Sequence, residues 1–320
     1  EARFRRALAL GPAHPTALAE TKYNLAMALL RQGRLEAGFE AMEGRRGLPD
    51  FQPEPFPDLP WWEGEALEGP LLLFSDQGFG DTLMMARYLP YLLREGLSCV
   101  ICVERTLQAV LATAAPGLTF VAPGDPLPRC SAKVALLSLP LRFGTRLDRL
   151  PAAVPYLHVP PGPPLPALEA RFQAASNCPK VGVVWAGNPG HAQDAQRSLD
   201  PELLAPLAGL PGLTWWSLQV GRTTHPSLPG LEDLGPLLRD FSDTAFALSQ
   251  LDLLITVDTA TAHLAGALGL PTLLLLPFVA DWRWLEGRED SPWYPTFQLH
   301  RQPSPGDWPS VVAQLVENLR

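Results

Sequence analysis

The chain has 320 residues, of which 47% are hydrophobic and 18% charged, and its formal net charge at pH 7 is -8. This length allows two globular domains with full cores, and the acidic balance argues against a nucleic-acid partner, which would require a basic face. Because no apolar run approaches the length of a membrane-spanning helix, we expect no transmembrane segment.

Residues 1–47 contain helical stretches that are rich in small residues. Small and apolar residues recur around Leu8 and again from Tyr23 to Ala41, in a pattern that resembles a tetratricopeptide repeat, where small residues let paired helices pack closely. The stretch amounts to about one and a half repeats, too few to be stable alone. We therefore expect it to end a longer array or to pack on the adjoining part of the chain, and a simple helical hairpin is the alternative.

A proline-rich segment occupies residues 48–70. It holds prolines at positions 49, 53, 55, 57 and 60, and then Trp61 and Trp62. Because prolines this dense prevent regular structure, the sequence predicts an extended linker. The two tryptophans are expected to fasten this linker to a domain surface.

From 71 to 154, apolar runs alternate with amphipathic stretches. The predicted strands are 71–75, 98–103, 118–121 and 133–137, and the predicted helices lie near 82–94 and 105–114. This alternation is typical of a parallel sheet, so we expect a Rossmann-like domain. Cys99 and Cys102 lie three apart on one predicted strand and point to opposite faces. They are therefore expected to be buried free thiols in a reducing, cytoplasmic compartment.

A second proline-rich stretch marks the predicted domain boundary. Prolines at 155, 160, 161, 163, 164 and 166 indicate a semi-rigid hinge over 155–175. Strands are then predicted at 181–186, 213–218, 252–257 and 272–276, which indicates a second Rossmann-like domain over 176–302. Asp200, Ser242 and Asp307 are the expected helix caps, and Asp307 begins a C-terminal helix within 303–320.

The first turn with candidate chemistry is Gln77-Gly78-Phe79-Gly80-Asp81, after the strand predicted at 71–75. Its glycines allow the backbone to approach a ligand closely. Leu83 stands where a dinucleotide fingerprint has its third glycine, which disfavours a nicotinamide or flavin cofactor. Asp81 lies at the predicted helix start, so it either caps this helix or acts as a general base toward a hydroxyl.

A second turn of this kind, Asp258-Thr259-Ala260-Thr261-Ala262-His263, comes after the strand predicted at 252–257. Thr259 and His263 are four residues apart and share one helix face. The N–H groups at this helix start would favour an anion such as a diphosphate, and a capped helix with a satisfied histidine is the alternative. Because ligands of parallel sheets sit at the carboxyl ends of strands, the two turns suggest two α/β domains that face a cleft.

A polar loop comes after the strand predicted at 181–186. It begins with Gly187 and Asn188 and continues to Arg197 and Ser198. Loops at strand ends often reach over a ligand, and Arg197 suits a phosphate, whereas a solvated loop is the alternative. The aromatic stretches at 281–284 and 291–295 are expected to pack a long loop onto its own domain. The sequence lacks the signatures of zinc metalloproteases, P-loop NTPases and α/β-hydrolases.

Together these motifs resemble the heptosyltransferase-like inverting glycosyltransferases of family nine, in the branch whose enzyme follows tetratricopeptide repeats. The resemblance covers nearly everything from Trp61 to the C-terminus. The matching segments are 77–81, 185–189, 197–198, 217–219, 257–265 and 281–284. The resemblance implies the GT-B fold, an α/β architecture of two Rossmann-like domains facing a cleft, here preceded by a short all-α tetratricopeptide-like segment.

The resemblance also implies roles for single residues. It makes Asp81 the catalytic base, and Gln77, Gly78, Phe79 and Gly80 the acceptor-side loop. It places the nucleotide-sugar donor on Gly187, Asn188, Arg197, Ser198, Gln219, Asp258, Thr259, Ala260 and His263. The heptosyltransferases use lysine in a different local setting where Arg197 is assigned, and a threonine-rich tip where Asn188 stands.

The implied activity is inverting, metal-independent transfer of a hexosyl- or heptosyl-type sugar from a nucleotide-sugar to a hydroxyl of a protein or surface glycan. The nucleotide-sugar is a co-substrate, and neither a cofactor nor a metal is expected. The helical repeats are expected to recruit the acceptor. The alternatives are a non-catalytic binding or scaffold protein, and a sugar-nucleotide epimerase on the same frame.

Overall fold

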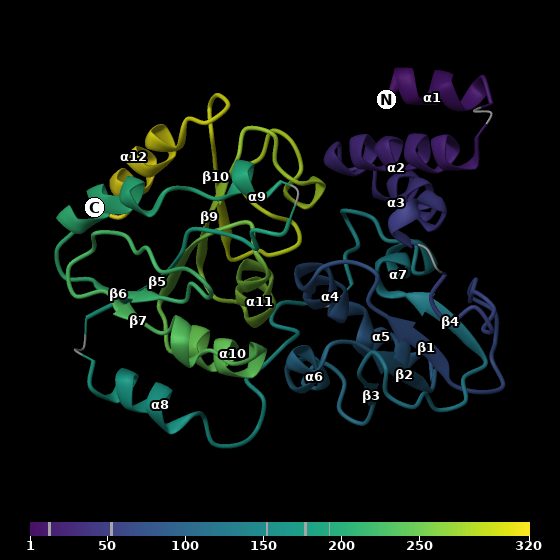
Figure 1. The fold of residues 1–320 in the computed structure, drawn as a ribbon, viewed down its shortest axis with the longest axis horizontal. Coiled ribbons are helices and arrows are strands. Elements are labelled where there is room, and N and C mark those ends of the chain that lie inside the picture. Colours follow the sequence, from purple (N-terminus) through teal and green to yellow (C-terminus); the bar gives the residue numbers. More distant parts are fainter. Residues whose placement is uncertain (12–13, 52–53, 152, 176–177, 192) are drawn as a thin grey trace. The chain divides into compact units, whose positions relative to one another are not determined.

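The structure is a computed structural model that describes residues 1–11, 14–51, 54–151, 153–175, 178–191 and 193–320 (Figure 1). The chain divides into two compact units. Unit 1 contains Glu1–Arg105, Ala115–Ala152 and Asp281–Gly287, and unit 2 contains Thr106–Ala114, Ala153–Ala280 and Arg288–Arg320. Within the predicted segments, residues 12–13, 52–53, 152, 176–177 and 192 lie outside the described residues.

Unit 1 contains a parallel sheet with the strand order β3-β2-β1-β4. Its strands are β1 (Leu71–Phe74), β2 (Cys99–Cys102), β3 (Thr119–Val121) and β4 (Ala132–Ala135). Every residue of β1, β2 and β4 is buried. Burial on both faces explains the continuous apolar runs of β1 and β2. The four strands predicted in this half are confirmed, with small differences at their ends.

The chain after β1 does not form the single helix predicted near 82–94. It forms α4 (Phe79–Met85), the 3-10 turn Ala86–Tyr88 and α5 (Leu89–Arg94). Pro90 in the first turn of α5 lacks the N–H that a continuous helix would need. Gly78 is the N-cap residue of α4, so Asp81 is the third helical residue and does not cap the helix. Farther along the chain, α6 (Arg105–Ala112) follows β2, and the 3-10 turn Leu136–Ser138 and α7 (Leu139–Arg142) follow β4.

Residues 1–47, here called the helical segment, form three helices that stack on one another within unit 1 (Figure 1). They are α1 (Ala2–Ala9), α2 (Pro15–Arg31) and α3 (Leu35–Met42), followed by the 3-10 turns Glu43–Gly47 and Pro49–Phe51. A small residue permits the close packing, since a Cβ added to Gly38 would lie 2.5 Å from the side chain of Leu30. The tetratricopeptide character of this segment stays a prediction.

The proline-rich linker is attached to the edge strand β4. Trp61 forms an isolated parallel bridge with Lys133, and the N–H of Trp62 donates to the Lys133 carbonyl at 2.8 Å. The Trp62 side chain is buried. The predicted fastening by two tryptophans is therefore confirmed, whereas the short 3-10 turn Pro49–Phe51 is regular structure that the linker was not expected to have.

Unit 2 contains a parallel sheet with the order β10-β9-β8-β5-β6-β7. Its strands are β5 (Lys180–Val184), β6 (Thr214–Ser217), β7 (Glu232–Asp233), β8 (Leu253–Val257), β9 (Thr272–Leu276) and β10 (Phe297–Arg301). Apolar residues of β5, β8 and β9 form a core with the 3-10 helix Pro201–Gly209 and with α12 (Trp308–Asn318). The four predicted strands are confirmed. β7 and β10 were not predicted, because β7 has only two residues, both acidic, and because Gln298 and His300 separate the apolar residues of β10.

Unit 2 has five further helical elements among the described residues. They are α8 (Pro166–Gln173), α9 (Asp194–Arg197), the 3-10 turn Gly235–Leu237, α10 (Phe241–Ser249) and α11 (Ala260–Leu268). Of these, α10 and α11 begin at residues whose side chains cap the helix. Asp200 and Asp307 cap helices as predicted. The predicted cap at Ser242 is wrong, because the Asp240 side chain accepts hydrogen bonds from the backbone N–H groups of Ser242 and Asp243.

The aromatic stretch after β9 is grouped differently from the prediction. It was expected to pack onto the domain at 176–302, but Asp281–Gly287, with the 3-10 turn Trp282–Trp284, belongs to unit 1. The Trp282 ring meets Phe39 of α3 edge-on with centroids 5.5 Å apart, and the N–H of Glu286 donates to the Arg31 carbonyl at 3.0 Å. Such long-range contacts leave no local sequence pattern. Conversely, Thr106–Ala114 from the predicted first domain belongs to unit 2.

Candidate functional site

Strand order determines where a ligand site can form in each sheet. The order reverses between β1 and β4 in unit 1, and between β5 and β8 in unit 2. Ligands of open α/β sheets bind beyond the carboxyl ends of the strands at such a reversal. The turn at 77–81 follows β1, the loop at 185–198 follows β5, and Asp258 follows β8 directly. Apart from Gln219, which follows β6, the site residues predicted from the sequence therefore follow the strands that flank the reversal in their own sheets.

The turn at 77–81 is held at its base by short polar contacts. The hydroxyls of Ser75 and Thr82 lie 2.7 Å apart. Both the N–H and the hydroxyl of Thr82 donate to the Gly78 carbonyl, at 3.1 Å and 3.2 Å. The first three residues of the turn are exposed, and an Asp81 oxygen lies 3.6 Å from where a Cβ on Gly78 would be. The turn is thus fixed at its base and open at its tip.

Asp81 forms an ion pair with Arg283 inside unit 1, and the two side chains are only 19% and 12% exposed. Arg283 also pairs with Asp281 at 2.5 Å and lies over the ring of Trp282 at 4.4 Å from its centroid. A guanidinium in contact with a carboxylate stabilises the charged form of that carboxylate and fixes the direction in which it points. Arg283 was not predicted from the sequence as a site residue, although an arginine between two tryptophans was a visible signal.

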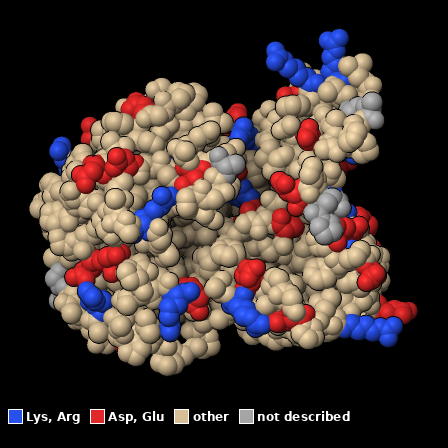
Figure 2. All heavy atoms as spheres, in the orientation of Figure 1, with Lys and Arg blue, Asp and Glu red and all other residues tan. Residues whose placement is uncertain are grey.

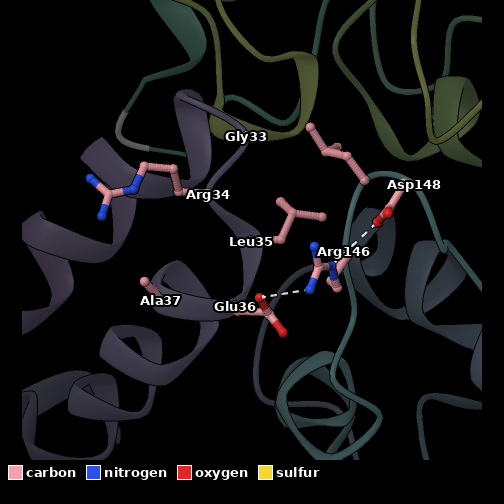
Figure 3. A pocket seen from close by; sticks show the side chains of 8 residues that line it. Gly33, Arg34, Leu35, Glu36, Ala37, Arg146 and Asp148 are labelled. Carbon is pink, nitrogen blue, oxygen red and sulfur yellow. Dashed lines mark ion pairs between the residues drawn. The ribbon is translucent and has the colours of Figure 1, made fainter.

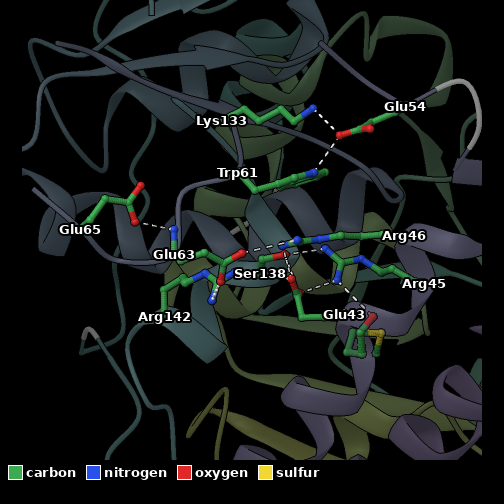
Figure 4. A network of polar contacts seen from close by, with 11 residues as sticks. Glu43, Arg45, Arg46, Glu54, Trp61, Glu63, Glu65, Lys133, Ser138 and Arg142 are labelled. Atoms are coloured by element: carbon green, nitrogen blue, oxygen red, sulfur yellow. Dashed lines mark hydrogen bonds and ion pairs between the residues drawn. The ribbon is translucent and has the colours of Figure 1, made fainter. Parts of the chain in front are cut away.

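A second arginine holds the residue just before the turn. Arg45, in the 3-10 turn Glu43–Gly47, is 1% exposed, and its Nε donates to Asp76 at 2.7 Å. Its other donors reach Glu43 and Ser138, each at 2.8 Å, and Ser138 donates to Glu43 at 2.7 Å (Figure 4). Because Asp76 follows β1 and Ser138 follows β4, this guanidinium lies at the reversal point of the first sheet.

More charges extend this network toward the linker. Glu43 also pairs with Arg46 and with Arg142, which in turn reaches Glu63 at 2.5 Å (Figure 4). Burial lowers the pKa of Arg45, but the adjacent carboxylates outweigh it and raise that pKa above its usual range. Burial likewise raises the pKa of Glu43, yet the neighbouring arginines bring it below its ordinary value of 4.5. The Arg45 guanidinium and the Glu43 carboxylate are therefore both charged members of this buried network.

The linker is held by a separate ion pair. Lys133 of β4 is fully buried, and its ammonium donates to Glu54 at 2.6 Å and to the Pro55 and Phe56 carbonyls at 2.8 Å and 3.0 Å. The Trp61 indole donates to the same Glu54 carboxylate at 2.8 Å (Figure 4). The linker thus supplies the hydrogen-bond acceptors for a lysine that lies in a buried strand.

In unit 2, the loop after β5 is organised around Asp194. Its carboxylate accepts from the Ser198 hydroxyl at 3.0 Å and from Arg222 at 3.1 Å, and Arg197 lies 3.5 Å away. Ser198 in turn accepts from the N–H of Gly187 at 3.0 Å. Arg197, the predicted cation, and Arg222 therefore both pair with the carboxylate of Asp194. Arg222, which lies in the loop after β6, was not predicted from the sequence.

Two predicted donor residues in this region have structural partners. Asn188 is exposed, and its side chain accepts from the Gly190 N–H at 2.9 Å, which shapes the tip of the loop. Gln219 is buried, and its carboxamide oxygen accepts from the N–H groups of Trp185 and Ala186 at 3.1 Å and 2.9 Å. Its amide nitrogen donates back to the Ala186 carbonyl at 3.1 Å. Gln219 thus ties the loop after β6 to the loop after β5.

The segment after β8 forms the second part of the unit 2 site. Thr259 caps α11 by accepting from the Ala262 N–H, and Ala260 is the first helical residue. His263 is 4% exposed, with its Nδ1 2.9 Å from the Tyr294 hydroxyl and its Nε2 3.8 Å from Asp258. The start of this helix combines a partial positive charge with a carboxylate and an imidazole, a set suited to hydroxyls and an anion.

A separate hollow of about 470 Å³ in unit 1 lies between the α2–α3 turn and the loop at 146–148 (Figure 3). Arg146 on its wall pairs with Asp148 at 3.4 Å and with Glu36 at 3.7 Å, and Arg34 pairs with Glu1 at 2.6 Å. These charges neutralise one another. Over the face in Figure 2, Lys and Arg are likewise interspersed with Asp and Glu.

Neither a metal cluster nor a membrane-spanning helix is found in the part of the chain that the structure describes. Among those residues, no three His, Cys, Asp or Glu side chains group so that they could hold a metal ion. None of the described helices is both long and apolar enough to cross a membrane.

No family model matches the chain. Protein FlbA of Caulobacter vibrioides is 28% identical over 352 residues, which covers 97% of this chain and 56% of that protein. The chain therefore spans little more than half of the length of the curated relative that it matches.

Solved glycosyltransferase structures share the fold. A family 9 glycosyl transferase of Veillonella parvula has a TM-score of 0.51 at 14% identity, covering 81% of this chain and 99% of that one. The E. coli ADP-heptose heptosyltransferase II has 0.52 at 13%, covering 78% and 98%. The iron-containing dodecameric glycosyltransferase TibC of E. coli has 0.51 at 13%, covering 78% and 76%. At such identities the likeness concerns the fold, and it confirms the predicted family-nine-like α/β architecture with parallel sheets.

Proposed function

We propose that this chain carries an inverting, metal-independent glycosyltransferase that moves a sugar from a nucleotide-sugar to a hydroxyl. One observation carries the proposal: in both sheets, the predicted residues at 77–81, 187–198 and 258–263 follow the strands that flank the reversal of strand order. That is where open α/β sheets bind ligands. The shared fold with family 9 glycosyltransferases supports the same conclusion.

In the proposed reaction, unit 1 supplies the base. Asp81 accepts the proton of the acceptor hydroxyl, and the oxygen attacks the anomeric carbon on the face opposite the leaving group. The new carbon–oxygen bond forms as the bond to the diphosphate oxygen breaks, so the configuration inverts. Arg283 pairs with the Asp81 carboxylate and directs it.

Unit 2 supplies the groups for the donor. The departing nucleoside diphosphate gains negative charge, which the N–H groups at the start of α11 stabilise beside Asp258 and His263. Arg197 and Arg222 offer further positive charge at the loop after β5. Because these charges come from the protein, the reaction needs no metal to stabilise the leaving group.

The acceptor is a hydroxyl of a protein or surface glycan, and the helical segment recruits it. This assignment rests on the packing of the helical segment into the unit that holds Asp81. The reaction takes place in the cytoplasm, which agrees with four free cysteines, two of them buried. The neighbour of known structure that is named for ADP-heptose supports a nucleoside diphosphate-sugar as the donor class.

The test is a screen of nucleoside diphosphate-sugars with mass spectrometry of the products. Asp81→Asn should lower the transfer rate at least about 100-fold, since loss of a general base costs that much or more. Asp148→Asn is the matched control, because Asp148 is 74% exposed in the same unit. Full transfer by Asp81→Asn refutes the assigned base. Turnover of the donor without an acceptor indicates an epimerase, and failure to bind any donor indicates a scaffold.

A further inference from the structure

We propose that Arg283 is a positioning residue for Asp81, and that the helical segment holds Arg283 in place and is thereby a working part of the site. The inference rests on the proposed function, because it assigns a role in the same proton transfer. It concerns unit 1 alone, to which all of these residues belong.

The contacts of Arg283 hold its side chain in one orientation. Its guanidinium pairs with Asp81 and Asp281 and lies over the Trp282 ring, and the side chain is 12% exposed. Asp281 also caps the short 3-10 turn by accepting from the Arg283 N–H at 3.1 Å. A side chain fixed by two carboxylates and a ring directs its donors at Asp81 with little freedom.

The helical segment fixes the backbone that carries Arg283. Phe39 of α3 meets the Trp282 ring edge-on, and the Arg31 carbonyl at the end of α2 accepts the N–H of Glu286 at 3.0 Å. Trp282 and Trp284 are both almost fully buried. Between these anchors, Leu285 has a φ of 51°. A non-glycine residue adopts this left-handed region only where its surroundings force it to do so.

A second link joins the same helices to the other end of the turn. Arg45, at the end of the helical segment, pairs with Asp76, which directly precedes the turn at 77–81. Both carboxylates that bracket the turn are therefore held by arginines that depend on the helical segment. Burial raises the pKa of Tyr23 on α2, and the charges of Arg283 and Arg45 both oppose that rise, so the three side chains share one neighbourhood.

This arrangement has a specific kinetic consequence. If Arg283 only stabilised the fold, its removal would lower the amount of active protein and leave the catalytic constants unchanged. As a positioning residue it acts on proton transfer, whereas the donor groups lie on separate residues of unit 2. Its loss should therefore lower kcat about 10- to 100-fold, as a misplaced reacting group does, and leave KM for the donor unchanged.

The experiment uses the whole chain and four variants: Arg283→Ala, Arg283→Lys, Phe39→Ala and Arg288→Ala. Arg288 is the matched control, because it pairs with Asp290 on the surface. Steady-state kinetics are measured with and without millimolar guanidinium, with equal sodium chloride as the salt control. The expected result is a lower kcat for Arg283→Ala that guanidinium partly restores, partial activity for Arg283→Lys, and a reduced kcat for Phe39→Ala. Arg288→Ala should match the unaltered chain.

The opposite results overturn the inference. A folded Arg283→Ala with an unaltered kcat, or a loss that neither guanidinium nor lysine restores, excludes a positioning role. If the unaltered chain transfers no sugar, the proposed function fails, and the coupling is then tested by unfolding. In a double-mutant cycle, Phe39→Ala and Asp81→Asn should interact in urea unfolding of the whole chain, whereas strict additivity would refute the link.

Discussion

Replacing Arg45 by methionine tests whether the helical segment is built into the first sheet. Methionine keeps an unbranched chain but removes the donors to Asp76, Glu43 and Ser138. The Asp76 side chain is only 2% exposed, so its charge would stay buried without its guanidinium. Breaking a buried pair in this way costs about 3–5 kcal/mol, a large share of the roughly 5–15 kcal/mol that stabilises a typical domain.

The assay is urea unfolding of the whole chain, monitored by tryptophan fluorescence. Arg105→Met is the control, because Arg105 and Asp125 are 72% and 31% exposed, and such a surface pair contributes about 0–1 kcal/mol. Adding Asp76→Asn to Arg45→Met should recover part of the loss, since it removes the orphaned charge. Equal effects of Arg45→Met and Arg105→Met would show that the buried network contributes no more than a surface pair.

Three further outcomes are expected from the structure. A Cβ on Gly187 would lie 2.5 Å from Asp194, so Gly187→Ala should weaken nucleoside diphosphate binding about tenfold in a thermal-shift titration, whereas Gly209→Ala, with nothing within 4 Å, should not. Burial lowers the pKa of His300 from 6.5. The unfolded chain then takes up a proton that the folded chain refuses, so stability should fall as the pH drops below about 6.5, and His300→Gln should flatten this dependence. Burial raises the pKa of Cys99 to about 12, so this thiol should react with a thiol reagent only on unfolding.

Local patterns predicted the sheets well. A strand that is buried on both faces, such as β1, consists of consecutive apolar residues. Such a run can be recognised in the sequence without knowledge of the fold. The same holds for Asp307, which caps α12 through contacts within three residues. Ser242 shows the limit of such reading, because two polar residues near one helix start compete, and the backbone angles of Asp240 decided between them.

Contacts between segments that are distant in the sequence could not be predicted. Asp81 was found from its place in a glycine-rich turn, but its partner Arg283 lies some 200 positions later in the sequence. Nothing near residue 283 indicates that its segment packs on α2 and α3. Gln219 was assigned to the donor from resemblance, yet its amide is engaged with backbone groups of the loop after β5. Composition can propose a polar residue for a ligand, but only packing shows which partners it already has.

The choice of charged residues at the junction between the helical segment and the first sheet has a physical consequence. Apolar side chains of similar volume would hold two elements together at least as strongly, because burying a charge carries a large desolvation penalty. Apolar contacts, however, have no preferred direction. A guanidinium with fixed donors defines where each carboxylate lies and how it is turned. Arg45 and Arg283 apply that constraint at Asp76 and Asp81, the two ends of the one turn whose geometry must be exact for proton transfer.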